Sequence, residues 1–322
     1  MKEILRVEGL TVYYYTLEGV VKAVRDVSFE LRRGESLCLV GESGSGKSTL
    51  GLAIMGTLPT NAKIVRGKIL FDGVDIVSLG RKELEEIRGK RISIIFQDPV
   101  ATFNPLFTVG EVLEDVLRYK LGLKGKEALR RRALESLKLV GLPDAERVYR
   151  SYPHELSGGI LQRVAIAVAL STSPELLIAD EPTTMLDVTL QAQILDLLQE
   201  LRRRLGLSVI YITHNLGVAA TVCDRVMIIY AGSVMELGPI DEILLNPLHP
   251  YTKRLIECVP RSSIKTGRLR HIPGMLPDLL HLPKGCVFEP RCEESMEECK
   301  VRQPKLMEVR PGHFVACLKC CK

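Results

Sequence analysis

The sequence predicts an α/β fold built on a mostly parallel β-sheet with helices on both faces. Short apolar runs at residues 37–40, 176–179, 209–213 and 226–230 are separated by stretches with helical periodicity. This alternation is typical of a parallel sheet, because parallel strands need long crossover connections and these are usually helices. The chain departs from this pattern in its N-terminal region, in one helix-rich stretch and near its C-terminus.

Each departure has its own sequence signal. The first 35 residues alternate polar and apolar positions, for example at Leu10, Val12 and Tyr14, which predicts antiparallel strands. Asp72-Gly73 separates two short apolar segments and predicts a hairpin turn. Residues 109–148 are mostly helix formers with helical apolar spacing, which predicts a helical insertion. Around residues 246–251 proline becomes frequent, so we expect a domain boundary there.

Composition and charge narrow the class of protein. The 322 residues, 46% hydrophobic and 26% charged, are enough for one large domain and a smaller one. The net charge of +5 suits an anionic ligand but is too small to indicate nucleic-acid binding. The chain lacks an apolar run long enough to span a membrane, and its N-terminus lacks a signal-peptide core. We therefore expect a cytosolic protein with reduced thiols.

A phosphate-binding loop begins at Gly41 and ends with Lys47 and Ser48. It fits G-x-x-x-x-G-K-[ST] and lies between the apolar run at 37–40 and a helical segment, which is the context that this motif requires. Its glycines let backbone N–H groups converge on phosphate oxygens, and the helix N-terminus adds a favourable dipole. We expect Lys47 to reach the β and γ phosphates of a nucleotide and the Ser48 hydroxyl to bind Mg²⁺.

Polar residues follow the ends of three other predicted strands: Gln97, Asp180 with Glu181, and His214. Parallel sheets bind ligands at the carboxyl ends of their strands. Asp180 is therefore predicted to hold Mg²⁺ through its hydration shell, and Glu181 to orient or deprotonate the attacking water. His214 is predicted to contact the γ-phosphate, and Gln97 to bridge Mg²⁺ and water. For Asp180 and Glu181 the alternative is a role in capping the following helix. For His214 it is a structural histidine, and for Gln97 a hydrogen-bonded loop residue.

A second anion cradle is predicted at Ser157-Gly158-Gly159, where a helical segment begins. The serine hydroxyl, the glycine N–H groups and the helix dipole all suit a phosphate. A serine that only caps its helix explains the same residues equally well on local grounds. One nucleotide rarely needs two sets of phosphate ligands from one chain, so this second set could serve a neighbouring chain.

Taken together, these motifs resemble those of the ATP-binding-cassette (ABC) ATPases over about residues 4–245. The resemblance rests on six motifs in order along the chain: the Walker A loop (41–49), the Q-loop Gln97, the signature Leu156-Ser-Gly-Gly159, Walker B with Glu181, the D-loop Met185-Leu-Asp187 and the switch His214. Ile160-Leu161 and Met185 depart from the common pattern, but neither removes a catalytic group. The resemblance implies a P-loop ABC ATPase fold with a RecA-like parallel-sheet core, an N-terminal antiparallel β subdomain and a helical subdomain at about residues 101–163.

The family resemblance also implies a head-to-tail dimer of ATPase subunits. Glu181, His214 and Gln97 would be catalytic, and Mg²⁺ would be held through Ser48, Gln97 and Asp180. Among three consecutive tyrosines, the alternation of the strand favours Tyr14 over Tyr13 and Tyr15 as the adenine-stacking residue. The implied ATP ligands of the chain's own site are Tyr14, Gly41, Glu42, Ser43, Gly44, Ser45, Gly46, Lys47, Ser48 and Thr49. Those offered in trans to a partner are Ser157, Gly158, Gly159 and Asp187.

Residues 246–252 and 285–292 resemble the C-terminal extension of oligopeptide/dipeptide permease ATPases, which divides the chain into residues 1–245 and 246–322. This implies an ATPase at the cytoplasmic face of the membrane, with a second ATPase subunit (a related chain or a second copy), two transmembrane permeases and an external solute-binding protein, and no nucleic acid. Peptide is the expected solute, with oligosaccharide or nickel as alternatives. A soluble ABC ATPase acting on ribosomes or nucleic acid, a P-loop kinase and an inactive regulatory subunit are the rival functions.

Six of the nine cysteines fall in the last 37 residues, and the first four of these six are Cys286, Cys292, Cys299 and Cys317. The first four lack the close pairs of a zinc knuckle, but four cytosolic thiolates suit either zinc or an iron–sulfur cluster. Resemblance to the subfamily favours [4Fe–4S], with Zn²⁺ and free or disulfide-bonded thiols as alternatives. The predicted ligands are Cys286, Cys292, Cys299 and Cys317, with Cys320 and Cys321 as competitors. Cys38, Cys223 and Cys258 are expected in the core.

Overall fold

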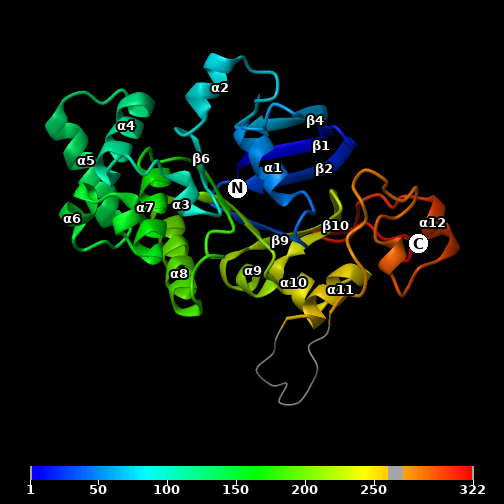
Figure 1. The fold of residues 1–322 in the computed structure, drawn as a ribbon. Helices are drawn as coiled ribbons and strands as arrows, with labels where there is room; N and C mark the ends of the chain where they lie inside the picture. The colour runs from blue at the N-terminus through cyan, green and yellow to red at the C-terminus, as the bar shows by residue number, and fades with distance from the viewer. Residues whose placement is uncertain (1, 260–270, 321–322) are drawn as a thin grey trace. The chain divides into compact units, whose positions relative to one another are not determined.

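The computed structural model describes residues 2–259 and 271–320, and the chain divides into two compact units. Unit 1 contains Met1–Val77 and Tyr211–Lys322, and unit 2 contains Ser78–Ile210. Figure 1 shows the elements of both units along the chain. The boundary predicted near residue 245 is a different division and stays a prediction.

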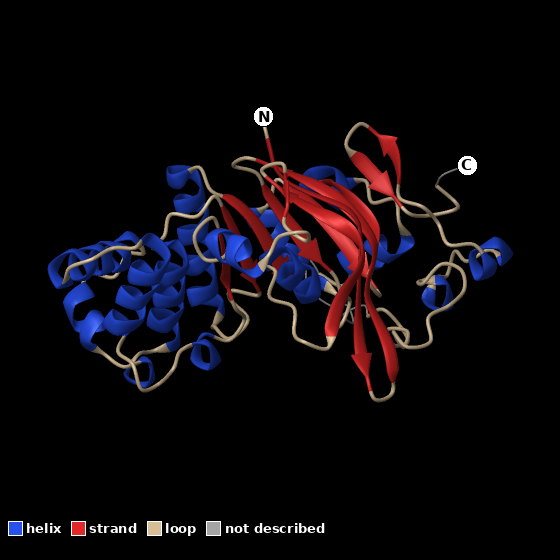
Figure 2. Cartoon of the chain, turned by 90° about the horizontal axis from the view of Figure 1, so that it is seen from above, coloured by secondary structure: helices blue, strands red, loops and turns tan. Residues whose placement is uncertain are grey.

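The N-terminal part of unit 1 is an antiparallel sheet, as the alternation of its residues predicts. Its strand order is β2-β1-β4-β5, and every neighbouring pair is antiparallel. Asp72 and Gly73 both have positive φ (49° and 85°) and form the predicted hairpin turn. Figure 2 shows the long strands of this sheet side by side. The strands are β1 (Glu3–Thr16), β2 (Gly19–Arg32), β4 (Ala62–Phe71) and β5 (Val74–Asp75).

The parallel strands predicted from continuous apolar runs are present in both units. In unit 1, β3 (Ser36–Val40) pairs in parallel with β9 (Arg225–Tyr230), and all five residues of β3 are buried. In unit 2, β6 (Ile92–Ile95) pairs in parallel with the fully buried β7 (Leu176–Asp180). β8 (Ser208–Thr213), which lies between β7 and β9 in the sequence, contains the boundary between the two units. Burial on both faces explains why these strands are apolar throughout rather than alternating.

The C-terminal extension adds two strands that the sequence analysis did not identify, β11 (Met307–Arg310) and β12 (His313–Val315). β12 pairs antiparallel with β11 and with β10 (Ser233–Pro239), which in turn pairs antiparallel with β9. The extension therefore continues the sheet of unit 1. β11 and β12 are too short for periodicity to reveal them. The remaining helices of unit 1 are α1 (Lys47–Met55), α9 (Leu216–Val222), α10 (Ile240–Leu245), α11 (Pro250–Glu257), the 3₁₀ helix η2 (Glu289–Arg291) and α12 (Glu297–Val301).

The predicted helical insertion is present in unit 2. α4 (Val109–Leu121) begins with a capping box between Thr108 and Glu111 and ends at Gly122, where φ is 65°. α4 packs with α5 (Lys126–Leu139), α6 (Ala145–Arg150) and α7 (Gly158–Leu170), as Figure 1 shows. Unit 2 also contains α2 (Arg81–Ile87), α3 (Pro99–Thr102), η1 (Pro153–Glu155) and α8 (Val188–Leu205). None of the helices in the described part of the chain has the length and apolar character to cross a membrane.

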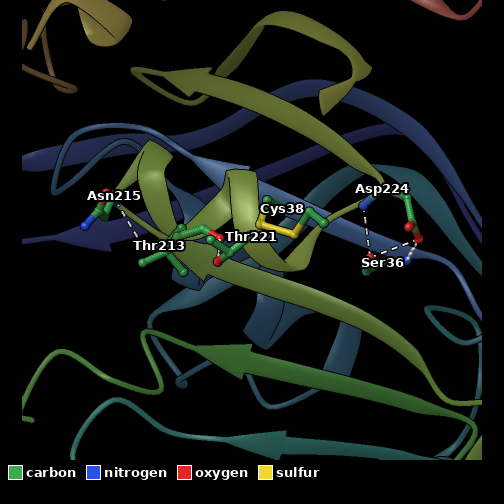
Figure 3. The surroundings of a disulfide bond; sticks show 8 residues. Ser36, Cys38, Thr213, Asn215, Thr221 and Asp224 are labelled. Carbon is green, nitrogen blue, oxygen red and sulfur yellow. Dashed lines mark hydrogen bonds between the residues drawn. A yellow bond between two sulfur atoms is a disulfide. The ribbon is translucent and has the colours of Figure 1, made fainter. Parts of the chain in front are cut away.

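Cys38 and Cys223 form a disulfide in the core of unit 1 (Figure 3). Both are buried, as predicted, but the expectation of reduced thiols is wrong for this pair. Cys38 lies on β3 and Cys223 directly follows α9, and the fold brings their Cα atoms to 5.9 Å, within the usual range for a disulfide. Because 185 residues separate the two, no sequence spacing indicates the bond. Cys258, also expected in the core, is a partly exposed free thiol.

Candidate active site

The phosphate-binding loop joins β3 to α1, which is the context its motif requires. Two of its positions accept only glycine. A Cβ at Gly41 would lie 2.1 Å from the carbonyl oxygen of Ile229. A Cβ at Gly46, where φ is 99°, would lie 2.1 Å from the carbonyl oxygen of Ala23. The close packing against neighbouring backbone therefore fixes the path of the loop.

Lys47 is buried within this loop, with an exposed fraction of 5%. Its Nζ donates hydrogen bonds to the carbonyl oxygens of Gly41 (2.9 Å) and Glu42 (2.8 Å). These bonds hold the ammonium over the interior of the loop, beside the N-terminus of α1. A buried cation at the N-terminus of a helix favours an anion there. Ser48 is exposed in the first turn of α1.

The three tyrosines near the end of β1 have different surroundings. The Tyr14 hydroxyl lies 3.1 Å from Thr49 Oγ1 on α1, which places Tyr14 on the side of the loop helix. Tyr13 instead lines a separate cavity with Arg25 and Arg66. Tyr15 is exposed, with the Lys63 ammonium over its ring. Tyr14 is therefore the tyrosine of the three that contacts α1.

In unit 2, Glu181 follows the buried end of β7 and meets the Q-loop. Gln97 Nε2 donates to Glu181 Oε2 over 3.1 Å. Glu181 has a φ of 45°, which is uncommon for a residue with a side chain, whereas the preceding Asp180 is buried within the strand. Strained backbone of this kind is concentrated at functional sites, because it persists only where the surroundings hold it. Gln97 and Glu181 thus form one polar pair at the ends of β6 and β7.

Thr184 belongs to the same group, and the sequence analysis did not single it out. Its hydroxyl donates to Glu181 Oε2 over 2.8 Å, and its backbone N–H donates to the Glu181 carbonyl over 3.2 Å. Glu181 Oε2 therefore accepts two side-chain hydrogen bonds, which orient the carboxylate. A hydroxyl residue three positions after a strand-end carboxylate was the only signal in the sequence.

The signature residues open α7 of unit 2. Ser157 and Gly158 are exposed, whereas Gly159 is buried, and a Cβ there would lie 3.2 Å from Leu190 of α8. Although Ser157 occupies the N-cap position, its hydroxyl makes no capping hydrogen bond to the described backbone of α7. Asp187, by contrast, caps α8 by accepting from Thr189 and Leu190 N–H groups. The two N-cap residues therefore differ: the Asp187 side chain caps the described backbone of α8, and the Ser157 side chain does not cap that of α7.

The predicted site residues divide between the two units. Tyr14, the phosphate-binding loop and His214, which is exposed directly after β8, belong to unit 1. Gln97, Asp180, Glu181, the signature and Asp187 belong to unit 2. Each unit thus carries a coherent part of the predicted chemistry: phosphate binding in unit 1, and water activation with the second anion cradle in unit 2.

The four cysteines predicted as metal ligands line one cavity of about 20 Å³ in the extension. Burial raises the pKa of Cys286 to about 11 and also raises the pKa of Cys292, which favours neutral thiols. Within residues 2–259 and 271–320, no group of three or more His, Cys, Asp or Glu side chains is arranged to hold a metal ion. The arrangement of the described residues therefore does not support the iron–sulfur prediction. The competitor Cys320 lies near the Leu248 carbonyl, and Cys321 lies outside the described residues.

Three features are typical of a P-loop ATPase of the cassette class: a phosphate-binding loop after a parallel strand, a carboxylate held by two side-chain hydrogen bonds at the end of another parallel strand, and an exposed Ser-Gly at the start of a helix. Comparison with known proteins gives the same class. The family model "ABC transporter" matches residues 24–184, and the model "Oligopeptide/dipeptide transporter, C-terminal region" matches residues 235–299.

Similar proteins extend over nearly the whole chain. The oligopeptide transport ATP-binding protein OppD of Salmonella typhimurium is 47% identical over 98% of this chain and 93% of its own length. The dipeptide transport ATP-binding protein DppD of Bacillus subtilis is 47% identical over 98% of this chain and 95% of its own. The solved ATP-binding cassette MJ0796, a dimer bound to ADP and phosphate, is 33% identical with a TM-score of 0.66, covering 74% of this chain and 99% of that one. The chain belongs to the ABC transporter family, with the C-terminal region of the oligopeptide/dipeptide transporters, and it is an ATPase.

Proposed function

We propose that this chain is the ATP-hydrolysing subunit of an ABC importer for peptides. The observation that carries the proposal is the match of both parts of the chain: the ATPase region and a C-terminal region found in oligopeptide/dipeptide transporters. Relatives named for oligopeptide and dipeptide transport cover almost the entire chain. Import of an oligosaccharide or of nickel by the same ATPase is the alternative.

In the proposed mechanism the loop at 41–49 binds the phosphates of ATP, with Lys47 at the β and γ phosphates and Tyr14 against the adenine. Its support is the burial of Lys47 and the contact of Tyr14 with the loop helix. Mg²⁺, which neutralises phosphate charge, would be held through Ser48, Gln97 and Asp180. In the structure, the carbonyl oxygens of Gly41 and Glu42 hold the Lys47 ammonium.

Hydrolysis in this proposal depends on Glu181 as the residue that orients or deprotonates water. Its carboxylate is aimed by Gln97 and Thr184, so its geometry is preorganised by neutral donors. His214 contacts the γ-phosphate. Ser157, Gly158, Gly159 and Asp187 complete the site of a partner subunit, which is supported by the exposed, non-capping hydroxyl of Ser157.

The proposed assembly contains a second ATPase subunit, which is a related chain or a second copy, and two transmembrane permeases that hold the pair at the cytoplasmic face of the membrane. The segment 98–108 after the Q-loop helps to receive the permeases. An external solute-binding protein delivers the solute, and nucleic acid is not a partner.

The solute is tested by purifying the intact assembly from native membranes with this chain as bait and reconstituting it in lipid vesicles. We expect ATP-driven uptake of labelled di- and oligopeptides, and ATPase activity that rises when the solute-binding protein carries peptide. Uptake of nickel or an oligosaccharide without peptide uptake would contradict the peptide assignment. Co-purification with ribosomes in place of permeases would contradict the importer.

An iron–sulfur cluster, or zinc, at Cys286, Cys292, Cys299 and Cys317 stays a prediction from the sequence. Its support is that the four thiols line a common cavity. The structure offers room there for about one water-sized atom, so a cluster requires the side chains to rearrange. Anaerobic purification with visible spectroscopy and metal analysis tests it. A colourless protein free of iron and zinc, purified from anaerobic cells, would end the metal assignment.

A further inference from the structure

Arg291, in the C-terminal extension, reaches the phosphate-binding loop. Its Nη1 donates to both carboxylate oxygens of Glu42, each over 3.0 Å. Glu42 is the second residue of the loop that begins at Gly41. Only 6% of the Arg291 side chain is exposed, against 29% of Glu42. This ion pair joins residues 249 positions apart and lies within unit 1.

The guanidinium of Arg291 is fixed on all sides. Besides Glu42, its Nη1 donates to the Tyr230 hydroxyl (3.1 Å), and the group lies over the Tyr230 ring. Its Nε donates to the Pro273 carbonyl (2.8 Å) and its Nη2 to the Ile272 carbonyl (3.2 Å). A planar guanidinium whose three nitrogens all have partners is a rigid fork, unlike a surface arginine that samples many rotamers.

Glu42 connects the Arg291 guanidinium to the phosphate-binding loop. Its carboxylate bonds Arg291, its backbone N–H donates to the Tyr251 hydroxyl (3.2 Å), and its carbonyl accepts from Lys47 Nζ (2.8 Å). One residue of the loop is thus held by the extension on two sides and holds the phosphate-binding lysine on the third.

The two tyrosines that bond to Arg291 and Glu42 belong to a buried aromatic cluster. Tyr230, Tyr251 and Phe288 are each at most 1% exposed, with ring centroids 4.7–5.2 Å apart. Phe288 comes from the extension, three residues before Arg291. Because closely packed interiors transmit strain, the position of the Arg291 guanidinium depends on the folded extension.

We propose that Arg291 is a positioning residue for nucleotide binding, through which the C-terminal extension sets the shape of the phosphate-binding loop. It touches no substrate itself. The Arg291 guanidinium fixes the Glu42 side chain, and the Glu42 carbonyl oxygen accepts a hydrogen bond from Lys47, the predicted phosphate ligand. The affinity of this chain for ATP therefore depends on the C-terminal extension as well as on the phosphate-binding loop.

The test is a double-mutant cycle in the full chain, with Arg291→Gln, Glu42→Gln and both together, measured by calorimetric titration of MgADP. Because each single change removes a hydrogen-bonded ion pair between charged groups, we expect it to raise the Kd for MgADP about tenfold. Because both changes remove the same contact, the double variant should be no weaker than the weaker single variant. In the assembled pair, KM for ATP should rise while kcat at saturating ATP stays within about twofold.

A purely structural role gives a different result. Partial misfolding lowers the binding stoichiometry and leaves Kd unchanged, whereas loss of positioning raises Kd at full stoichiometry. Arg254→Gln is the matched control, because Arg254 makes exposed ion pairs in the neighbouring helix α11 and should leave Kd unchanged. Arg291→Lys should recover part of the affinity. If Arg291→Gln fails to fold, Glu42→Gln reports on the same contact from the other side.

Unchanged Kd in Arg291→Gln or in Glu42→Gln at full stoichiometry would overturn the proposal. So would a double variant whose loss equals the product of the two single losses, because the two residues would then act independently.

Discussion

The two predicted anion cradles, the phosphate-binding loop of unit 1 and the signature of unit 2, have very different surroundings. In the loop, Lys47 is buried, two glycines touch neighbouring backbone, and Arg291 and Tyr251 grip Glu42. In the signature, Ser157 and Gly158 are exposed, and the Ser157 hydroxyl does not cap the described helix.

This difference indicates which of the two segments binds a nucleotide of its own chain and which binds that of a partner. Contacts from its own chain hold the loop, whereas Ser157 and Gly158 of the signature are exposed. A hydroxyl at a helix N-terminus that leaves its own helix uncapped keeps its hydrogen-bonding capacity for another ligand. We therefore propose that the loop binds the chain's own nucleotide and that the signature contacts the nucleotide bound by a partner subunit.

The largest predicted effect concerns the chemistry that neither cradle supplies. Glu181→Gln should slow ATP turnover of the assembled pair by roughly 10²–10⁴-fold, the usual contribution of a positioned base. Nucleotide binding should persist, since the phosphate ligands are unchanged. Turnover is measured by phosphate release and binding by titration. Hydrolysis at the original rate would remove Glu181 from the role.

A matched pair of glycine substitutions compares the two cradles directly. Gly46→Ala places a Cβ 2.1 Å from a backbone oxygen at a φ of 99°, so it should lower the free energy of unfolding by about 1–3 kcal/mol or more and weaken nucleotide binding. Gly158→Ala places a Cβ 3.7 Å from Leu186, an ordinary contact, and should leave stability unchanged. Denaturant unfolding of both variants measures the difference. Equal losses would show that the signature is as tightly packed as the loop.

A smaller effect separates capping from recognition. Asp187→Ala removes an N-cap that accepts two backbone N–H groups, and should cost about 0.5–2 kcal/mol of unfolding free energy. Ser157→Ala occupies the same position on α7 but removes no capping bond, so its thermal midpoint should match that of the unmodified chain. A loss of stability in Ser157→Ala similar to that in Asp187→Ala would return Ser157 to an ordinary capping role.

The sequence was sufficient for those features whose cause is local. The buried strand before Gly41 and the helix after Ser48 identify the loop, and strand-end placement identifies Gln97 and Glu181, which the structure joins by a hydrogen bond. Periodicity likewise predicted the antiparallel region and the helical insertion.

Features that depend on tertiary packing could not be predicted in this way. The bond between Cys38 and Cys223 and the ion pair between Glu42 and Arg291 join residues 185 and 249 positions apart. The strands β11 and β12 are only four and three residues long, and their pairing with the sheet of unit 1 comes from the fold. Nor does cysteine content alone determine geometry, because the four thiols share a cavity without a metal-binding arrangement among the described residues.

The central claim, that the signature serves a partner's nucleotide, is tested most directly by Ser157→Arg, measured twice. MgATP binding to the isolated chain should be unchanged, because the substitution leaves the phosphate-binding loop of unit 1 intact. ATP turnover of the assembled pair should be abolished, because a bulky cation would block the partner's site. Loss of ATP binding by the isolated variant, or full turnover in its assembled pair, would contradict the claim.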